Sequence, residues 1–244
     1  MNIFVRSLVP GVALALAPIV ALAAAGGPAK PLRHLAYSFT YTETSDRTQH
    51  DSGIGGPASG MADSKTGSSD KGEILVDVMG AAKDTSLVVS ISEKARDARS
   101  AAPVTCAAFS NTNVICENGK KVNDEELAVL RLLGAKFINT DLIDEKNHWN
   151  FGWTSDQLDR SVDFTVNAND NNMLKITEAR VEKVKGAQGY TASLDGKITY
   201  NLTKVVPVSI EEDTTTRQSI GMGDYDTART QISLTLESDS LGGN

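Results

Sequence analysis

The sequence has few of the residues that most often reveal a chemistry. Its 244 residues include only 2 cysteines, 3 histidines and 2 tryptophans. It contains no H-E-x-x-H zinc motif, no G-x-S-x-G nucleophile elbow and no P-loop. A catalytic triad would have to draw on His34, His50 or His148, which are scattered along the chain. The sequence therefore predicts no catalytic residue, no metal ligand and no cofactor. Whether the protein is an enzyme stays open, with a non-enzymatic role favoured.

Runs of lysine or arginine are also absent. The chain has 24 Lys+Arg against 31 Asp+Glu, which gives a formal net charge of -7. An acidic surface repels nucleic-acid phosphates and anionic lipid headgroups. We therefore expect no nucleic-acid partner and no docking on an anionic membrane by charge alone.

One long apolar run stands near the start of the chain, and none of comparable length follows it. The run Leu8–Ala23 has about 16 residues, fewer than the ~20 that span a bilayer. Two prolines interrupt it, and small residues fit an A-x-A cleavage rule that ends at Ala23 or at Ala25. We predict a cleaved secretory signal peptide of residues 1–23, with residue 25 as the alternative end. The mature protein is then exported, to the periplasm or the external medium, with no stable membrane span.

The two cysteines, Cys106 and Cys116, are separated by turn-forming residues. In an oxidising compartment such a pair predicts a disulfide. A redox pair usually has C-x-x-C spacing, and a zinc site would need two more ligands, so these alternatives are weaker. We expect a hairpin from about Pro103 to Glu117, stabilised by about 3 kcal/mol through closure of the loop.

Alternation of apolar and polar residues predicts strands through most of the chain. Leu35–Tyr41 places three aromatic residues and a leucine on one face, and Glu73–Met79 forms the clearest hairpin with Thr85–Ser92. Asp195-Gly196 is expected to be a turn between two later strands. The remaining predicted strands are Ala135–Thr140, His148–Trp153, Arg160–Asn167, Met173–Lys185, Tyr190–Leu194, Lys197–Val206 and Thr227–Leu236.

Two segments break the strand pattern. Asn123 or Asp124 can cap a helix that ends near Gly134, and most residues in between are apolar, with Arg131 as the polar exception. A helix that is apolar nearly all round is buried on more than one side. Residues 51–72 are rich in Gly, Ser and Asp, so we expect a flexible loop there, within a single domain of residues 26–244.

These elements predict a mainly β fold of the α+β kind. We expect a largely antiparallel curved sheet or half-barrel with one buried hydrophobic helix, following the signal peptide. This plan loosely resembles the half-barrels that carry lipoproteins or lipids between bacterial membranes. The resemblance is one of architecture, is carried by no single residue, and implies nothing about function.

Three aromatic residues, Trp149, Phe151 and Trp153, alternate along one face of a predicted strand. If they are exposed they form a stacking platform for an apolar ligand, and if they are buried they are core. Core is the expected role, because only 5% of the residues are aromatic. A ligand-facing wall that includes Leu130 of the predicted helix is the alternative.

The favoured function is therefore an exported, non-enzymatic protein that binds an apolar small molecule or an envelope protein, with its oligomeric state left open. The alternative is a secreted hydrolase whose carboxylates, such as Glu178 and Asp163, converge only in the fold. The acidic pair Glu211-Glu212 is expected to lie in a polar, solvated loop. A calcium loop over residues 167–178 is a weaker idea than a hairpin turn, because Lys175 would lie beside the ion.

Overall fold

The computed structural model describes residues 30–48, 65–84, 86–95, 102–133, 147–154, 158–185, 189–221 and 224–242. The predicted signal peptide, the predicted strand 135–140 and residues 51–64 of the predicted loop lie outside these ranges. In the described ranges, no helix is both long enough and apolar enough to cross a membrane.

The described residues form one open antiparallel sheet of eleven strands with a single α-helix, as the sequence predicts. The strand order is β5-β4-β3-β2-β1-β11-β10-β9-β8-β7-β6, so the first and last strands meet at the centre while β5 and β6 are the edges. Short 3-10 turns at Glu117–Gly119 and Ser240–Gly242 complete the elements. The bounds are β1 Arg33–Thr48, β2 Lys65–Ala81, β3 Leu87–Ala95, β4 Val104–Ala108, β5 Val114–Cys116, α1 Asp124–Leu133, β6 His148–Thr154, β7 Leu158–Asp170, β8 Met173–Val184, β9 Tyr190–Asn201, β10 Val206–Gly221 and β11 Asp224–Asp239.

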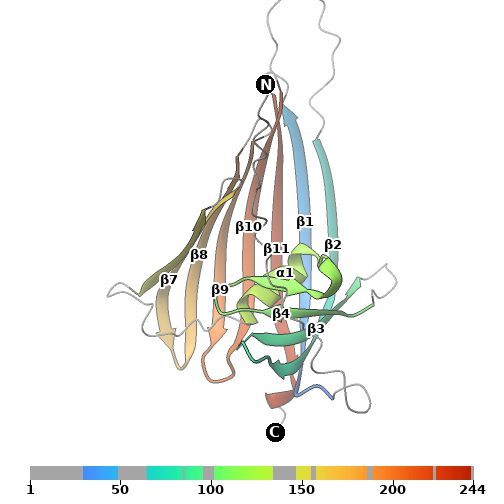
Figure 1. Ribbon diagram of the computed structural model, residues 1–244, viewed down its shortest axis with the longest axis vertical. Coiled ribbons are helices and arrows are strands. Elements are labelled where there is room, and N and C mark those ends of the chain that lie inside the picture. Colours follow the sequence, from blue (N-terminus) through green and yellow to red (C-terminus); the bar gives the residue numbers. More distant parts are fainter. Residues whose placement is uncertain are drawn as a thin grey trace, which may run out of the picture.

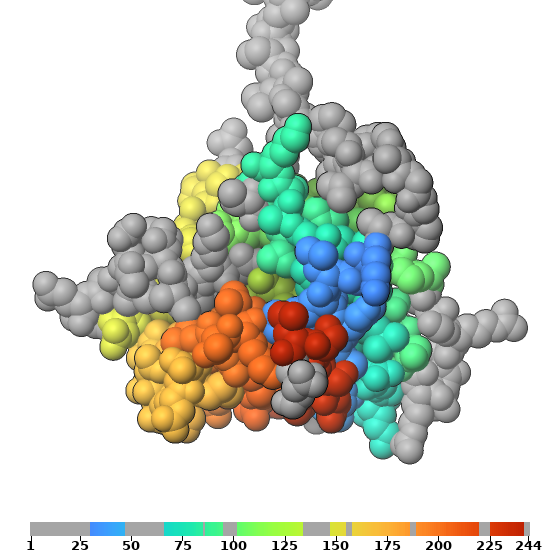
Figure 2. Space-filling view, turned by 90° about the horizontal axis from the view of Figure 1, so that it is seen from below, coloured from blue at the N-terminus to red at the C-terminus, as the bar shows by residue number. Residues whose placement is uncertain are grey.

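The sheet curls so strongly that α1 lies inside the curve. Figure 1 shows β4 passing in front of β10 and β11, with α1 beside it. The helix contacts β10 on one side and β3, β4 and β5 on the other. Viewed from below, the colours run along the lower rim from orange through red and blue to teal, which is the strand order from β9 to β2 (Figure 2). The helix is therefore buried on more than one side, as its apolar sequence predicts.

Side chains of a strand point alternately to the two faces of a sheet, and here the face toward α1 carries the core. We call it the inner face and the opposite one the outer face. Register aligns inner-face residues in rows that cross the strands. One row is wholly apolar and buried, and it consists of Ile176, Ile198, Ile210, Leu234 and Phe39.

Four residues further along the strands, the same face changes character. The inner-face residues of β10, β11 and β1 become Thr214, Thr230 and Glu43, which are aligned with one another and only partly buried. We call the apolar rows beneath α1 the covered half of the inner face. The rows from Thr214 onward are the open half.

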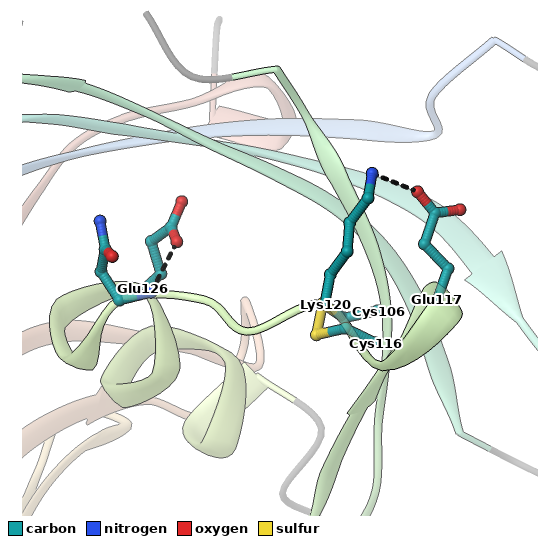
Figure 3. The surroundings of a disulfide bond; sticks show 6 residues. Cys106, Cys116, Glu117, Lys120 and Glu126 are labelled. Atoms are coloured by element: carbon teal, nitrogen blue, oxygen red, sulfur yellow. Dashed lines mark hydrogen bonds and ion pairs between the residues drawn. A yellow bond between two sulfur atoms is a disulfide. The ribbon is translucent and has the colours of Figure 1, made fainter.

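The helix begins where the sequence predicts. The Asn123 carbonyl oxygen accepts a hydrogen bond from the Leu127 N–H at 2.8 Å. The Asn123 N–H donates to Glu126 Oε2 at 3.0 Å, which is the carboxylate half of a capping box (Figure 3). Asn123 is thus the N-cap of α1.

The predicted cysteine hairpin and disulfide are confirmed. Cys106 of β4 and Cys116 of β5 are directly paired in the sheet, and their sulfur atoms are bonded at 2.04 Å (Figure 3). The bond ties the short edge strand β5 to its neighbour.

One expectation about a loop and one about a turn were wrong. Lys65–Gly72, predicted as the end of a flexible loop, forms the first half of β2, because each of its residues pairs with the long strand β1. Asp195-Gly196, predicted as a turn, lies within β9 and joins two predicted strands into one. In both segments, pairing with long neighbouring strands outweighs the local preference of glycine for turns.

The expectation for Glu211-Glu212 was also wrong. Both residues belong to β10, where Glu211 is exposed and Glu212 is only 6% exposed. The strand has no apolar alternation beyond this point because its next inner-face residues, Thr214 and Thr216, belong to the open half. Pattern analysis therefore had no apolar signal to detect.

Candidate functional site

The most deeply buried ion pairs of the described residues join α1 to the sheet. Arg131 of α1 is 3% exposed. Its Nη1 donates to Glu178 Oε1 of β8 at 2.7 Å, and its Nη2 donates to Glu212 Oε1 of β10. Both glutamates are buried. Since an unpaired buried charge is costly, a lone arginine in an apolar helix requires partners of this kind.

A glycine makes room for this arrangement. Strand β9 runs between β8 and β10, and it places Gly196 directly between Glu178 and Glu212. A Cβ atom at Gly196 would lie 3.2 Å from Glu178 Cβ and 3.7 Å from Glu178 Oε2. Both carboxylates can therefore reach the same guanidinium group. We call Arg131, Glu178, Glu212 and Gly196 the Arg131 cluster.

The electrostatics of the Arg131 cluster favour a structural role. Burial lowers the pKa of Arg131, but Glu212 and Glu178 outweigh it and hold that pKa above its ordinary value. The neighbouring Arg180 has its pKa lowered to about 10, by burial and then by repulsion from Arg131. Because a persistent cation engages both carboxylates away from solvent, the cluster anchors α1 to the sheet.

The predicted aromatic residues form a column along the inner face of the edge strand β6. Trp149 stacks on Phe164 of β7, with ring centroids 5.3 Å apart. Phe151 meets the same ring edge-on at 6.4 Å. Trp153 comes next, opposite Arg160 of β7. We call Trp149, Phe151 and Trp153 the aromatic column.

Exposure increases along the aromatic column. Trp149 is 5% exposed, Phe151 is partly buried against the core, and Trp153 is 57% exposed. Leu130 of α1, the fourth predicted ligand residue, is fully buried in the core. The fold therefore separates the four residues: Leu130 and Trp149 pack in the core, Phe151 lies at its margin and Trp153 lies on the surface.

The surroundings of Trp153 combine apolar area with a charged pair. Arg160 Nε lies 2.7 Å from Glu182 Oε1 of β8. Val184, the next inner-face residue of β8, is 42% exposed, and it pairs with the partly buried Tyr190 of β9. This end of the inner face can hold an apolar group against rings and methyl groups, with charged atoms beside it.

Three buried carboxylates gather at the start of α1, which the sequence did not lead us to expect. Glu125 and Glu126 are 7% and 6% exposed, and Glu93 of β3 is 7% exposed. Asn123 Nδ2 donates to Glu93 Oε2 at 2.6 Å. Burial, with the nearby Glu93 carboxylate adding to it, raises the pKa of Glu125 to about 7 and also raises that of Glu126.

The carboxylates named for a hydrolase do not converge. Glu178 lies on the inner face, whereas Asp163 lies on the outer face of β7. Asp163 Oδ1 is 3.3 Å from His148 Nε2, and Asp163 Oδ2 accepts a hydrogen bond from Ser161 Oγ at 3.1 Å. Ser161 thus donates to the carboxylate rather than to the imidazole, which is not the nucleophile–base geometry of a triad.

The segment that matched a calcium loop forms a hairpin turn between β7 and β8, as expected. Asn171 and Asn172 have φ angles of 50° and 66°, a conformation that asparagine tolerates better than most residues. Glu178, the final position of the calcium pattern, instead binds Arg131. In the described part of the chain, no group of three His, Cys, Asp or Glu side chains is arranged to hold a metal ion.

A groove lies on the outer face of the central strands. Its volume is about 510 Å³, and hydroxyl groups of β1 and β11 line it together with charged side chains of β2 and β3. Lys94 Nζ is 3.7 Å from Glu73 Oε2 inside it. The lining residues are Ser38, Phe39, Thr40, Lys71, Gly72, Glu73, Lys94, Ser233 and Thr235.

Comparison with known proteins places the chain in no family. No family model matches the chain, and no curated protein sequence matches it. One similar solved structure is described as "lipid-protein interactions in lipovitellin", with 10% sequence identity and a TM-score of 0.46. The similarity covers 89% of this chain and 26% of the other, so the chain spans about a quarter of that protein's length. A similarity at this level does not bear on function.

Proposed function

We propose that this chain is an exported, non-enzymatic binding protein that holds an apolar ligand against the aromatic column of β6. The observation that carries the proposal is the 57% exposure of Trp153, one of only two tryptophans in the chain. Trp153 continues a column whose other members are packed on the core, so its position is fixed while its ring stays accessible.

The neighbouring residues support a small apolar ligand. Large aromatic rings contribute most of the contact area in many binding sites, and a few polar groups set the orientation. Trp153, Phe151 and Val184 supply the apolar contacts, and the Arg160–Glu182 pair supplies the polar atoms. A protein partner that inserts an apolar side chain would use the same surface, and it is one outcome of the tests below.

Export is part of the proposal. The Cys106–Cys116 disulfide fits an oxidising compartment, and the apolar run Leu8–Ala23 fits a signal peptide. The intact mass of the chain recovered from an exported fraction tests this directly. We expect a chain that begins after Ala23 or Ala25, and a chain that retains residues 1–23 would contradict cleavage.

Native mass spectrometry of the exported protein, purified without detergent, tests the ligand. We expect an apolar adduct of defined mass that is lost in Trp153→Ala. The matched control is Ile115→Ala, which removes another exposed apolar side chain, at the opposite edge of the sheet. The proposal fails if no adduct is found after incubation with a lipid extract, or if both variants keep it equally.

Fluorescence gives a second test because the chain has only two tryptophans. In Trp149→Phe, the remaining emission comes from the exposed Trp153, so acrylamide should quench it strongly. Addition of the extracted ligand should shift this emission to the blue and reduce quenching. In Trp153→Phe, the buried Trp149 should show neither change, and a response there would place the ligand elsewhere.

A further inference from the structure

Arg180 of β8 is a second arginine on the inner face, and its partners are more distant than those of Arg131. Its Nη2 lies 3.5 Å from Glu178 Oε1, and its Nη1 lies 3.9 Å from Glu182 Oε1. Both distances exceed the roughly 2.7–2.9 Å of a hydrogen bond between charged groups. Its Nε is buried and has no hydrogen-bond partner among the described residues. The guanidinium group of Arg180 is therefore incompletely paired within the described part of the chain.

The two carboxylates nearest to Arg180 are each engaged by another arginine. Glu178 Oε1 accepts the hydrogen bond from Arg131 Nη1 at 2.7 Å. Glu182 Oε1 lies 2.7 Å from Arg160 Nε. Burial, and then repulsion from Arg131, lowers the pKa of Arg180 to about 10. Since a buried cation without a counterion of its own is costly, an anionic oxygen that accepts hydrogen bonds from Arg180 would stabilise its charged form.

Apolar side chains flank Arg180 on the inner face. Arg180 pairs with Val162 of β7 and with Leu194 of β9, which are 1% and 8% exposed. Val162 pairs in turn with Phe151, the middle member of the aromatic column. Because neighbouring strands lie about 4.8 Å apart, β8 and the aromatic column of β6 are separated by about 10 Å. The Arg180 side chain is 13% exposed, so a cation that solvent reaches lies a short distance from the surface proposed to hold the ligand.

We propose that the ligand held by the aromatic column is a single-chain amphiphile with an anionic headgroup, a carboxylate or a phosphate, and that Arg180 binds this headgroup. This inference rests on the proposed function and adds the chemical class of the ligand to it. The hydrocarbon chain lies along Val162 and Phe151 towards the exposed Trp153, and the anionic oxygens accept hydrogen bonds from the guanidinium group. Arginine suits both headgroups, because its planar fork of N–H donors matches the oxygens of carboxylates and phosphates.

Three probes with the same decyl chain length test the headgroup. Decanoate carries a carboxylate, monodecyl phosphate carries a phosphate, and decanol carries no charge. Each is added below its critical micelle concentration to the exported chain after removal of bound lipid, and isothermal titration calorimetry measures the dissociation constant. We expect at least one anionic probe to bind about tenfold more tightly than decanol. The anionic probe that binds more tightly identifies the headgroup as carboxylate or phosphate.

Substitutions at Arg180 test the residue. Arg180→Gln removes the charge, so the affinity for the preferred anionic probe should fall about tenfold, while the affinity for decanol should not change. Arg180→Lys retains a positive charge and should keep part of the preference for the anion. The matched control is Lys183→Gln, which removes a positive charge from the exposed outer face of the same strand. It should change neither affinity.

The outcomes separate this inference from the proposed function. If the unmodified chain binds decanol as tightly as both anionic probes, the role of Arg180 is overturned, while binding of an apolar ligand stays supported. Equal losses of the anionic probe in Arg180→Gln and Lys183→Gln would also overturn it, because net charge and not the guanidinium contact would then set the affinity. An equal loss of decanol and the anionic probe in Arg180→Gln has the same meaning. If none of the three probes binds, the proposed function fails together with this inference.

Discussion

The covered and open halves of the inner face belong to the same strands, yet only one of them is core. Ile210 of β10 and Leu234 of β11 pair in the covered half and are at most 1% exposed. Four residues further along β10, Thr214 pairs with Thr230 and both are only partly buried. Strand length here follows from pairing with long neighbours, whereas burial follows from the position of α1.

The Arg131 cluster marks the border between the two halves. Glu212 follows the apolar row of β10 and precedes Thr214. Arg131 reaches this border from α1 and binds carboxylates on two strands that are not adjacent. The covered half should therefore carry most of the stability. The open half, whose inner-face residues such as Thr214 and Thr230 are only partly buried, should carry less of it.

Removing the arginine of the Arg131 cluster should have the largest effect on stability. Arg131→Ala leaves Glu178 and Glu212 buried without their cation, which should reduce the free energy of unfolding by about 3–5 kcal/mol. The control is Arg229→Ala, which breaks an exposed pair with Asp213 on the outer face and should have a much smaller effect. Urea denaturation measures both, and equal effects would contradict the anchoring role.

Truncating one apolar residue in the covered half and one at the end of β6 compares their contributions to stability. Leu130→Ala opens a cavity in the covered half and should cost about 2–5 kcal/mol. Trp153→Ala removes a larger side chain that is 57% exposed, so it should cost less than about 1 kcal/mol. Thermal or urea unfolding distinguishes the two, and a larger loss from Trp153→Ala would show that the β6 end belongs to the core.

The two strand glycines make a finer comparison. In Gly196→Ala the new methyl group lies 3.2 Å from Glu178 Cβ, and we expect a loss of about 1–3 kcal/mol from overpacking. In Gly152→Ala the nearest atom is at 4.0 Å, so the change should stay within about 0.5 kcal/mol. Similar unfolding midpoints for both variants would contradict the role given to Gly196.

The smallest effect concerns pH. Burial raises the pKa of Glu125 from 4.5 to about 7, so the folded chain binds a proton more tightly than the unfolded chain. The resulting stabilisation is complete below about pH 4.5 and is lost as the pH rises through about 7. The melting temperature should fall over this interval, and Glu125→Gln should flatten the fall. An unchanged profile in the variant would contradict the assignment.

Much of the fold can be predicted from the sequence, because the buried residues of the covered half appear in it as alternating apolar residues. Strands such as β1 and β8 show the predicted alternation of apolar and polar residues. The helix begins at its predicted N-cap, and the cysteine hairpin forms where its turn residues predict it. The first half of β2 and most of β10 leave no such pattern, since their inner-face residues are polar. Their strands form because long neighbouring strands pair with them.

The Arg131 cluster could be foreseen only in part. A single arginine inside an apolar helix signals a buried cation that needs carboxylate partners. The identity of those partners depends on strands 47 and 81 residues away in sequence, which no local pattern encodes. Trp149 and Trp153 show the same limit, because the period of the strand places both on one face but does not determine how far the core extends along it.

Hydrogen exchange along single strands tests the central claim, that α1 divides one sheet into a stable half and an accessible half. In β10, amides near Ile210 should exchange only through global unfolding, while amides from Thr214 onward should exchange much faster through local opening. The same contrast is expected along β11, between Leu234 and Thr230. Uniform protection along both strands would contradict the account.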